Sequence, residues 1–313
     1  MRLFVKALSN LTSFMIPAII LLPFAIAGQT SLEKYTLEYW NLKGKVSYME
    51  EIKYSADEYM NGLQKGKVLQ KEIHRFDTEG NLLEEEMYID REFRRKTYTY
   101  NKSGKIIAYE SYNERGLSYF STYDYDITGI HVTDENGYNK DGSLSSKIKK
   151  QYDARGNQTE FVAYSPDGRM TTKTTYAYND KGYLTEEHLQ NIEPNLFEVT
   201  WTSKYDAKGN RIGLDRYDPG RPVYKQTFAF DANGNKIEDN VLNDDGSVKH
   251  KVTYAYDAQK NKTEITEIGS DGTIKFITTY TYEYDSQKNW TNSIYTVNKV
   301  PKYIYVRTIK YHP

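Results

Sequence analysis

The sequence predicts an all-β protein, in which about 20 short antiparallel strands form an up-and-down meander. Two observations lead to this fold class. An aromatic residue followed by Asp or Asn recurs about every 26 residues, and the residues between these positions alternate between apolar and polar types. Even spacing over most of a chain indicates a repeat architecture. Alternation indicates a strand that buries one of its faces.

Nine of these aromatic-Asp or aromatic-Asn markers align along the chain. They are Phe76-Asp77, Tyr100-Asn101, Tyr125-Asp126, Tyr152-Asp153, Tyr178-Asn179, Tyr205-Asp206, Phe230-Asp231, Tyr256-Asp257 and Tyr284-Asp285. A tenth, degenerate copy starts at Trp40, and the larger gap after it predicts a longer loop near residues 55–65. A second turn lies about midway between most markers. Each unit therefore contains two strands and two short turns.

The marker turns have a specific chemistry. The Asp or Asn side chain accepts hydrogen bonds from N–H groups further along the turn, and a Gly three residues later takes a positive φ. Structural turns are expected at Asp153 and Gly156, at Asp206 and Gly209, and at Asp231 and Gly234. In two copies Lys260 and Lys288 stand in the place of Gly and are followed by Asn. We expect a shifted turn there, since Asn tolerates the left-handed region well.

The strands have one aromatic face. A clear example is the alternating set Ile274, Phe276, Thr278, Tyr280, Tyr282 and Tyr284. The opposite face is rich in Thr, Lys, Glu and Ser, as in an antiparallel sheet with one dry face. No segment has the apolar spacing of an amphipathic helix, so the sheet must cover its own aromatic face. Because open sheets seldom exceed about ten strands without curling, we expect a spiral or open β-shell, or else two packed layers.

The N-terminus predicts export. Residues 1–27 combine a basic start at Arg2 and Lys6, an apolar run over residues 14–27 and a small-x-small site at residues 25–27, which is the pattern of a cleaved secretory signal peptide. An anchoring helix is the alternative, but a span needs about 20 apolar residues. Residues 28–313 then form the repeat domain, with repeats from about residue 38, in a secreted or periplasmic protein. With no cysteine, the chain has no disulfide and no lipid-accepting Cys.

Charge excludes several classes of partner. Removal of residues 1–27 leaves 40 basic and 43 acidic residues, a net charge of −3. This balance predicts no binding of nucleic acid or of an anionic membrane surface. We also expect no integral membrane insertion after signal cleavage. An outer-membrane barrel is a further class, disfavoured because a lipid-facing stripe should be aliphatic.

Three hexamers carry a resemblance to a known family. They are YDARGN (152–157), YDAKGN (205–210) and FDANGN (230–235), and they resemble the signature of the YD-repeat, or RHS-repeat, family. The resemblance covers about residue 38 to the end. It implies an exported bacterial protein with a hollow β-shell, of a kind that encloses a toxin or serves in adhesion or carbohydrate binding. The chain lacks the C-terminal core with self-cleaving aspartates and any domain after the repeats, so it is most similar to short, stand-alone members.

No catalytic or metal-binding motif is present. The five histidines are scattered, without metal-ligand spacing, and no cysteine ligand exists. Strings typical of serine hydrolases, phosphate-binding loops and zinc proteases are missing. We therefore expect no metal, no cofactor and no enzymatic activity, with a hydrolase as the enzyme alternative that no motif supports.

Aromatic residues are the candidates for binding. Those that recur two residues apart, such as Tyr98 and Tyr100, are expected to form cross-strand core pairs, with a platform for sugar rings as the alternative. Trp40, Phe120 and Trp290 break the repeat and are the better binding candidates, unless they cap the ends of the array. The sequence thus favours a binding or structural surface at the cell envelope, with carbohydrate or another envelope component as partner. The alternative is a shell that holds a toxin or other polypeptide supplied by a separate chain.

Overall fold

The computed structural model describes residues 35–59, 62–192 and 196–313. The strands are β1 (Val46–Tyr59), β2 (Gly62–Phe76), β3 (Leu82–Ile89), β4 (Glu92–Tyr100), β5 (Ile106–Asn113), β6 (Gly116–Tyr125), β7 (Val132–Asn139), β8 (Leu144–Tyr152), β9 (Gln158–Tyr164), β10 (Met170–Tyr178), β11 (Leu184–Asn191), β12 (Phe197–Tyr205), β13 (Arg211–Tyr217), β14 (Tyr224–Phe230), β15 (Lys236–Leu242), β16 (Val248–Tyr256), β17 (Lys262–Gly269), β18 (Ile274–Tyr284), β19 (Trp290–Val297) and β20 (Val300–Tyr311). Each strand pairs antiparallel with the next, which confirms the predicted meander. None of the described residues forms a helix long and apolar enough to cross a membrane. The predicted signal peptide lies outside the described residues.

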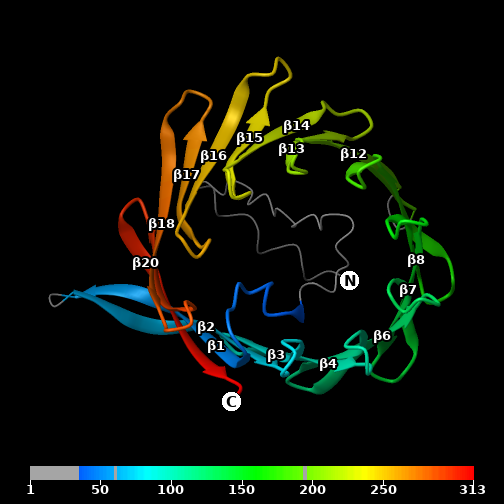
Figure 1. The fold of residues 1–313 in the computed structure, drawn as a ribbon, viewed down its shortest axis with the longest axis horizontal. Helices are drawn as coiled ribbons and strands as arrows, with labels where there is room; N and C mark the ends of the chain where they lie inside the picture. The colour runs from blue at the N-terminus through cyan, green and yellow to red at the C-terminus, as the bar shows by residue number, and fades with distance from the viewer. Residues whose placement is uncertain (1–34, 60–61, 193–195) are drawn as a thin grey trace, which may run out of the picture.

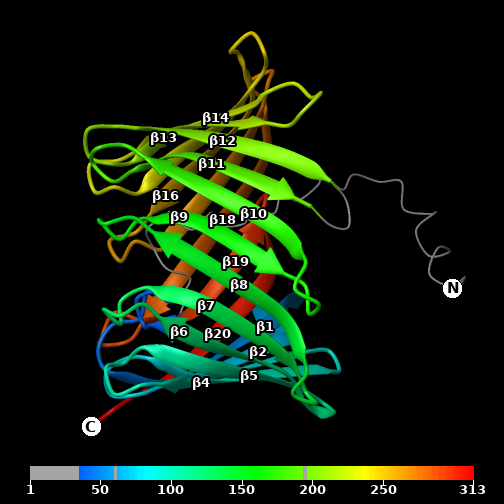
Figure 2. The ribbon, with the colours of Figure 1, turned by 90° about the vertical axis from the view of Figure 1, so that its right-hand side faces the viewer.

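The sheet closes into a barrel (Figure 1). β1 is hydrogen-bonded to β2 on one side and to β20 on the other, with Met49 opposite Ile309 and Ser55 opposite Tyr303. Figure 2 shows the strands running obliquely across the wall. The predicted spiral or open shell is therefore wrong. The physical reason is that a twisted sheet of this size can bring its first and last strands together, and closure pairs the main-chain groups that an open edge would expose.

The β1–β2 hairpin also differs from the prediction. The longer loop expected near residues 55–65 is instead a continuation of β1 to Tyr59 and of β2 from Gly62. These two strands are the longest of the barrel, and their far ends project outside the ring of strands (Figure 1). The register shifts around Tyr54, which marks a bulge where the hairpin leaves the wall.

The two walls of the barrel differ in character. Tyr98, Tyr109 and Ser121 lie opposite one another on neighbouring strands and face the interior. The outer wall carries ion pairs such as Lys173–Glu160, at 2.7 Å. Contrary to the expected dry face, the inner wall also contains charged residues such as Lys150 and Glu135, which interact with each other. A barrel of this strand number is too wide for side chains to fill, so its inner wall need not be wholly apolar.

All marker turns share one hydrogen-bond pattern. Asp153 Oδ1 accepts from the main-chain N–H groups of Arg155 and Asn157, both at 2.9 Å, and Asn157 Nδ2 donates to Asp153 Oδ2 at 2.9 Å. Gly156 has a φ of 83°. The turns of Asp206 with Gly209 and of Asp231 with Gly234 repeat this arrangement, with φ values of 90° and 81° at the glycines. The Asn that ends each hexamer thus closes the turn.

The turns that contain lysine are not shifted, so that expectation is wrong. Lys260 and Lys288 themselves adopt the left-handed conformation, with φ values of 66° and 65°. The turn around Lys260 keeps the hydrogen bond from Asp257 N to Asn261 O, at 2.9 Å. The register is retained, since Asp257 Oδ1 accepts from the N–H groups of Gln259 and Asn261 as in the glycine turns. The Asn residues that follow the two lysines also bind the chain before β1. Asn261 Oδ1 accepts from Asn41, and Asn289 Oδ1 accepts from the main chain of Lys43.

Marker tyrosines connect successive repeats. Tyr100, for example, donates its hydroxyl hydrogen bond to the carbonyl oxygen of Leu82 at 2.7 Å, and Tyr178 does the same to Gln158 at 2.8 Å. Tyr98 lies two residues earlier on the same strand as Tyr100 and contacts Tyr109 across the strands. The predicted core role is confirmed for this set, since Tyr98 is in the hydrophobic cluster and pairs across the strands with Tyr109, and Tyr100 packs against the same cluster.

Candidate functional site

Ten equivalent positions form a ring inside the rim that carries the marker turns. Each residue of this set lies six or seven positions after a marker aromatic. Nine of the ten are paired opposite that aromatic, and the tenth, Val46, is paired opposite Tyr311 of β20. We call the set the rim ring, and it consists of Val46, Leu82, Ile106, Val132, Gln158, Leu184, Arg211, Lys236, Lys262 and Trp290. Equivalent positions of a repeat are expected to be alike, so differences among them point to specialised roles.

One arc of the rim ring is apolar and buried. Val46, Leu82, Ile106 and Val132 are each at most 2% exposed and belong to one hydrophobic cluster. Residues 35–45 cover this arc, and we call them the inner segment. Figure 1 shows the inner segment, in dark blue, within the ring of strands. The apolar arc is therefore a binding surface for a polypeptide segment.

Aromatic side chains anchor the inner segment to the wall. The ring of Tyr35 lies 4.6 Å from that of Tyr98, and the ring of Trp40 lies 4.7 Å from His74 and 5.5 Å from Phe76. Such ring contacts add about 0.5–1.5 kcal/mol each beyond the buried area. They hold the inner segment against strands β2 and β4.

Side-chain amides fasten the inner segment to two marker turns. Asn289 Oδ1 accepts from Lys43 N at 2.7 Å, and Asn289 Nδ2 donates to Lys43 O at 2.8 Å. Asn41 Nδ2 donates to Gln259 O and to Asn261 Oδ1, both at 3.1 Å. The rim thus binds main chain of the inner segment at the Lys288 turn, whereas at the Lys260 turn the Asn41 side chain of the inner segment binds the rim.

A second arc of the rim ring is cationic. Arg211, Lys236 and Lys262 occupy the ring position in three consecutive repeats. Two aromatic rings alternate with them. Arg211 lies 5.6 Å from the Phe228 centroid and Lys236 lies 5.1 Å from it, while Lys236 and Lys262 lie 5.4 and 5.1 Å from the Tyr254 centroid. We call these three cations the basic arc.

The basic arc is only partly neutralised. Lys236 Nζ lies 3.0 Å from Asp239 Oδ2. Among the described residues, the side chains of Arg211 and Lys262 make no hydrogen bond or ion pair, although Glu187 interacts electrostatically with Arg211. Desolvation inside the barrel, and then the charge of Lys236, lower the pKa of the Lys262 ammonium. The like charge of Lys236 thus disfavours the charged form of Lys262.

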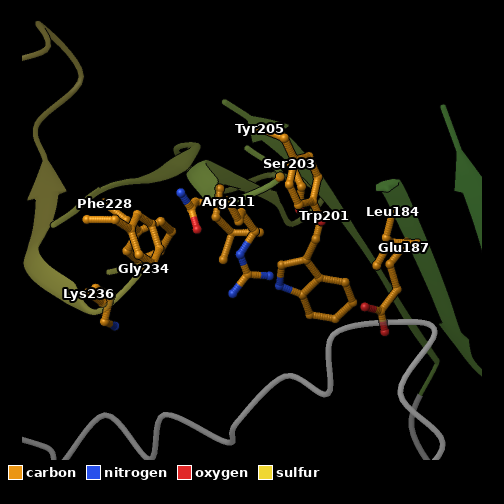
Figure 3. Close-up of a pocket in the computed structure, with 13 residues that line it drawn as sticks. Leu184, Glu187, Trp201, Ser203, Tyr205, Arg211, Phe228, Gly234 and Lys236 are labelled. Atoms are coloured by element: carbon orange, nitrogen blue, oxygen red, sulfur yellow. The ribbon is translucent and has the colours of Figure 1, made fainter. Parts of the chain in front are cut away.

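A pocket of about 300 Å³ opens beside the basic arc (Figure 3). Its lining includes Trp201, Phe228, Phe230, Glu187, Arg211 and Lys236. Figure 3 shows the guanidinium of Arg211 between the rings of Phe228 and Trp201 in that view. Burial raises the pKa of the Glu187 carboxyl, and Arg211 partly offsets this effect. The pocket combines flat aromatic surface with cations, which suits a ligand with apolar and anionic groups.

The three predicted binding aromatics do not come together. Trp40 is packed in the inner segment against His74 and Phe76. Trp290 belongs to the rim ring, where the guanidinium of Arg307 lies 3.5 Å from its centroid. Phe120 faces outward and stacks on Tyr138 at 4.8 Å. Their roles in binding stay predictions.

Sequence reasoning missed the basic arc and Trp201. A signal was available, because Arg211, Lys236 and Lys262 each stand six residues after a marker aromatic, where most other repeats have an aliphatic residue. The alignment alone does not show that this position faces inward at the rim. Within the described ranges, no group of three or more His, Cys, Asp or Glu side chains is placed to hold a metal ion.

The fold and the site define a closed repeat barrel whose inner rim is apolar on one arc and cationic on another. No protein-family model matches the chain, and no curated protein matches it. Membership of the YD-repeat family therefore stays a prediction from the hexamer motifs.

Solved structures include remote likenesses. A Tc holotoxin pore of Photorhabdus luminescens has a TM-score of 0.40 and 13% identity, over 74% of this chain and 14% of that one. The TcdB2-TccC3 structure without its hypervariable C-terminal region has a TM-score of 0.38 and 13% identity, over 80% and 16%. A porin-like protein from Bacteroides uniformis has a TM-score of 0.33 and 13% identity, over 86% and 98%. The chain spans only a small part of the two toxin chains, and TM-scores this low establish neither a shared detailed topology nor a shared activity.

Proposed function

We propose that the protein is an exported, non-enzymatic barrel whose inner wall holds a polypeptide. The observation that carries this proposal is the way in which the wall binds the inner segment. The wall binds that segment through aromatic contacts at Tyr35 and Trp40 and through main-chain hydrogen bonds from Asn289. A surface that binds one polypeptide segment in this way has the chemistry to bind another.

The rest of the inner rim supports the same function. Trp201, Phe228 and Tyr254 continue the aromatic wall beyond the inner segment, and the pocket beside them has room for side chains. Export rests on the signal-like pattern of residues 1–27. The YD-repeat resemblance, which implies shells that enclose a polypeptide, agrees with this proposal.

Binding of envelope polysaccharide has less support. Trp40 and Trp290, two of its candidate platforms, already contact His74 and Arg307. The third, Phe120, lies on the other wall. A sugar ring needs an aromatic face that is open to it.

The test uses the lack of cysteine in the chain. Ser203 lines the pocket on the inner wall, and its neighbour Thr202 faces outward from the same strand, β12. The variants Ser203→Cys and Thr202→Cys would each carry a benzophenone cross-linker. Each would be mixed with the exported proteins of the source cells and, separately, with insoluble envelope polysaccharide.

A discrete polypeptide should be joined to position 203 and none to position 202, because the two positions differ only in the wall they face. Equal cross-linking from both positions, or no polypeptide at position 203, would contradict the proposal. Protection of position 203 by polysaccharide would assign the inner wall to carbohydrate instead.

A further inference from the structure

We infer that the basic arc, formed by Arg211, Lys236 and Lys262, binds an acidic, extended polypeptide segment that also carries aromatic side chains. The inference deepens the proposed function and rests on it for the biological partner. It adds the chemical class of that partner and the residues that select it.

The spacing of the basic arc matches an extended chain. Arg211, Lys236 and Lys262 begin strands β13, β15 and β17, so two inter-strand steps separate each cation from the next. Neighbouring strands lie about 4.7–4.9 Å apart, which places successive cations about 10 Å apart along the rim. An extended chain of the polyproline II type has three residues per turn and rises about 3.1 Å per residue, so every third side chain points the same way, about 9.3 Å further along. In this conformation an acidic residue at every third position meets each cation in turn.

Electrostatics on the wall favour an anionic ligand. Lys236 has Asp239 as a partner, and Lys262 makes no ion pair or hydrogen bond through its side chain among the described residues. Arg211 also makes neither, although Glu187 lines the same pocket and interacts with it electrostatically. The three cations therefore face two carboxylates, Asp239 and Glu187, which leaves an excess of positive charge. Carboxylates of a ligand would form charge-assisted hydrogen bonds with these donors inside a partly desolvated site.

The aromatic surface beside the cations favours a ligand that also carries aromatic side chains. Phe228 and Tyr254 lie between successive cations, and Trp201 lines the pocket next to Arg211. The inner segment shows how this rim holds such side chains, because the rings of Tyr35 and Trp40 pack against those of Tyr98 and His74 on the neighbouring wall. The basic arc continues the same ring of positions, with cations in place of the aliphatic residues.

A purely structural role for the three cations is the competing explanation. Cation–π contacts with Phe228 and Tyr254 stabilise a folded protein without any ligand. In that case the substitutions below would change stability and not peptide binding. An anionic polysaccharide is the other class of ligand with suitable charge.

The test measures binding of defined probes to the purified protein by fluorescence anisotropy. The main probe is a labelled peptide of four Glu-Tyr-Ser units, which puts a carboxylate at every third residue. Control probes are a Lys-Tyr-Ser peptide, a peptide of the same composition with its four Glu residues together, and labelled alginate. The triple variant Arg211→Gln, Lys236→Gln, Lys262→Gln is compared with Lys147→Gln, Lys173→Gln, Lys251→Gln, which removes three outer-wall charges.

The Glu-Tyr-Ser peptide should bind the unmodified protein and the outer-wall variant alike, and the basic-arc variant on the order of 100-fold more weakly. The lysine peptide should not bind, and the peptide with clustered Glu should bind more weakly. Lys262→Gln alone should weaken binding about fivefold to tenfold, which keeps the test valid if the triple variant misfolds.

Equal binding by the basic-arc and outer-wall variants, or no binding of the Glu-Tyr-Ser peptide, would overturn the inference. Binding of alginate without binding of the peptide would overturn the polypeptide class. The two experiments distinguish failure of this inference from failure of the proposed function. Loss of peptide binding with retained cross-linking at position 203 contradicts only this inference, whereas loss of cross-linking contradicts the proposed function.

Discussion

The side chain of Asn289 binds both main-chain groups of Lys43, a residue 246 positions earlier in the chain. Its side-chain oxygen accepts from Lys43 N at 2.7 Å, and its side-chain nitrogen donates to Lys43 O at 2.8 Å and to the hydroxyl of Tyr311 at 2.8 Å. Asn289 is 2% exposed. One amide thus fastens the inner segment to the last marker turn, next to the seam between β1 and β20.

Replacement of Asn289 should be far more costly than replacement of the matching Asn in another repeat. Asn289→Ala removes both main-chain partners of Lys43 and the bond to the Tyr311 hydroxyl, and leaves a gap where a side chain is only 2% exposed, so we expect a loss of about 2–4 kcal/mol in the free energy of unfolding. Asn235→Ala removes only the side-chain bond to Asp231 and should cost about 1 kcal/mol. Urea unfolding measures both. Equal losses would show that the contact with Lys43 contributes nothing.

The tyrosine bonds between repeats should each contribute modestly. Tyr178→Phe removes the hydroxyl that donates to Gln158 O, and we expect a loss of about 1 kcal/mol. Tyr183 stacks on Tyr205 at 5.1 Å, and its hydroxyl has no hydrogen-bond partner among the described residues. Tyr183→Phe should therefore change the free energy of unfolding by less than about 0.5 kcal/mol. Thermal unfolding of both variants tests this difference, and a reversed order would refute it.

Replacement of a lysine in the left-handed conformation by glycine should stabilise the protein. Lys260 has a φ of 66°, which glycine adopts without steric cost. Lys260→Gly should therefore stabilise the protein by about 0.5–1 kcal/mol. The reverse change, Gly104→Lys at a φ of 71° with open space around the site, should destabilise it by about 1–2 kcal/mol. Urea midpoints that do not move in opposite directions would contradict the conformational explanation.

His74 should make the barrel sensitive to acid. Burial lowers the pKa of His74 to about 4, with Arg307 adding to the shift and Glu85 opposing it. Below pH 6.5 the unfolded chain binds a proton that the folded chain does not, so stability falls as the pH drops from 6.5 to 4. The shift of about 2.5 pH units corresponds to at most about 3 kcal/mol.

The variant His74→Phe isolates this contribution, because the other titrating groups are common to both proteins. The difference in free energy of unfolding between variant and unmodified protein should change in favour of the variant between pH 6.5 and pH 4. A difference that stays constant over this range would mean that His74 does not remain neutral inside the fold.

Local features were predictable because they depend on neighbouring residues. The spacing from Tyr152 to Tyr178 and the turn residues Asp153 and Gly156 are enough to predict strands β8 to β10 and their turns. The turn at Lys260 was predicted wrongly because Asp257, and not the residue in the place of glycine, sets its register. Asp257 Oδ1 binds the N–H groups of Gln259 and Asn261 as in the glycine turns, and lysine takes the left-handed conformation.

The residues of the basic arc can be aligned in the sequence, but the alignment does not show that they form one site. Arg211, Lys236 and Lys262 share one position in the repeat, yet an alternation pattern does not say which wall faces inward. The neighbours of Arg211, such as Trp201 on β12 and Phe228 on β14, become neighbours only through strand pairing.

The sequence by itself determined the all-β class, the number of strands, the meander and the marker turns, because a repeated local pattern specifies them one repeat at a time. Tertiary structure alone decided that β1 meets β20, that residues 35–45 lie inside, and that an apolar and a cationic arc share one rim. Closure depends on twist summed over twenty strands and on contacts between the two ends of the chain. No local pattern encodes such a sum, so the barrel and its inner wall emerge only when all the repeats are assembled.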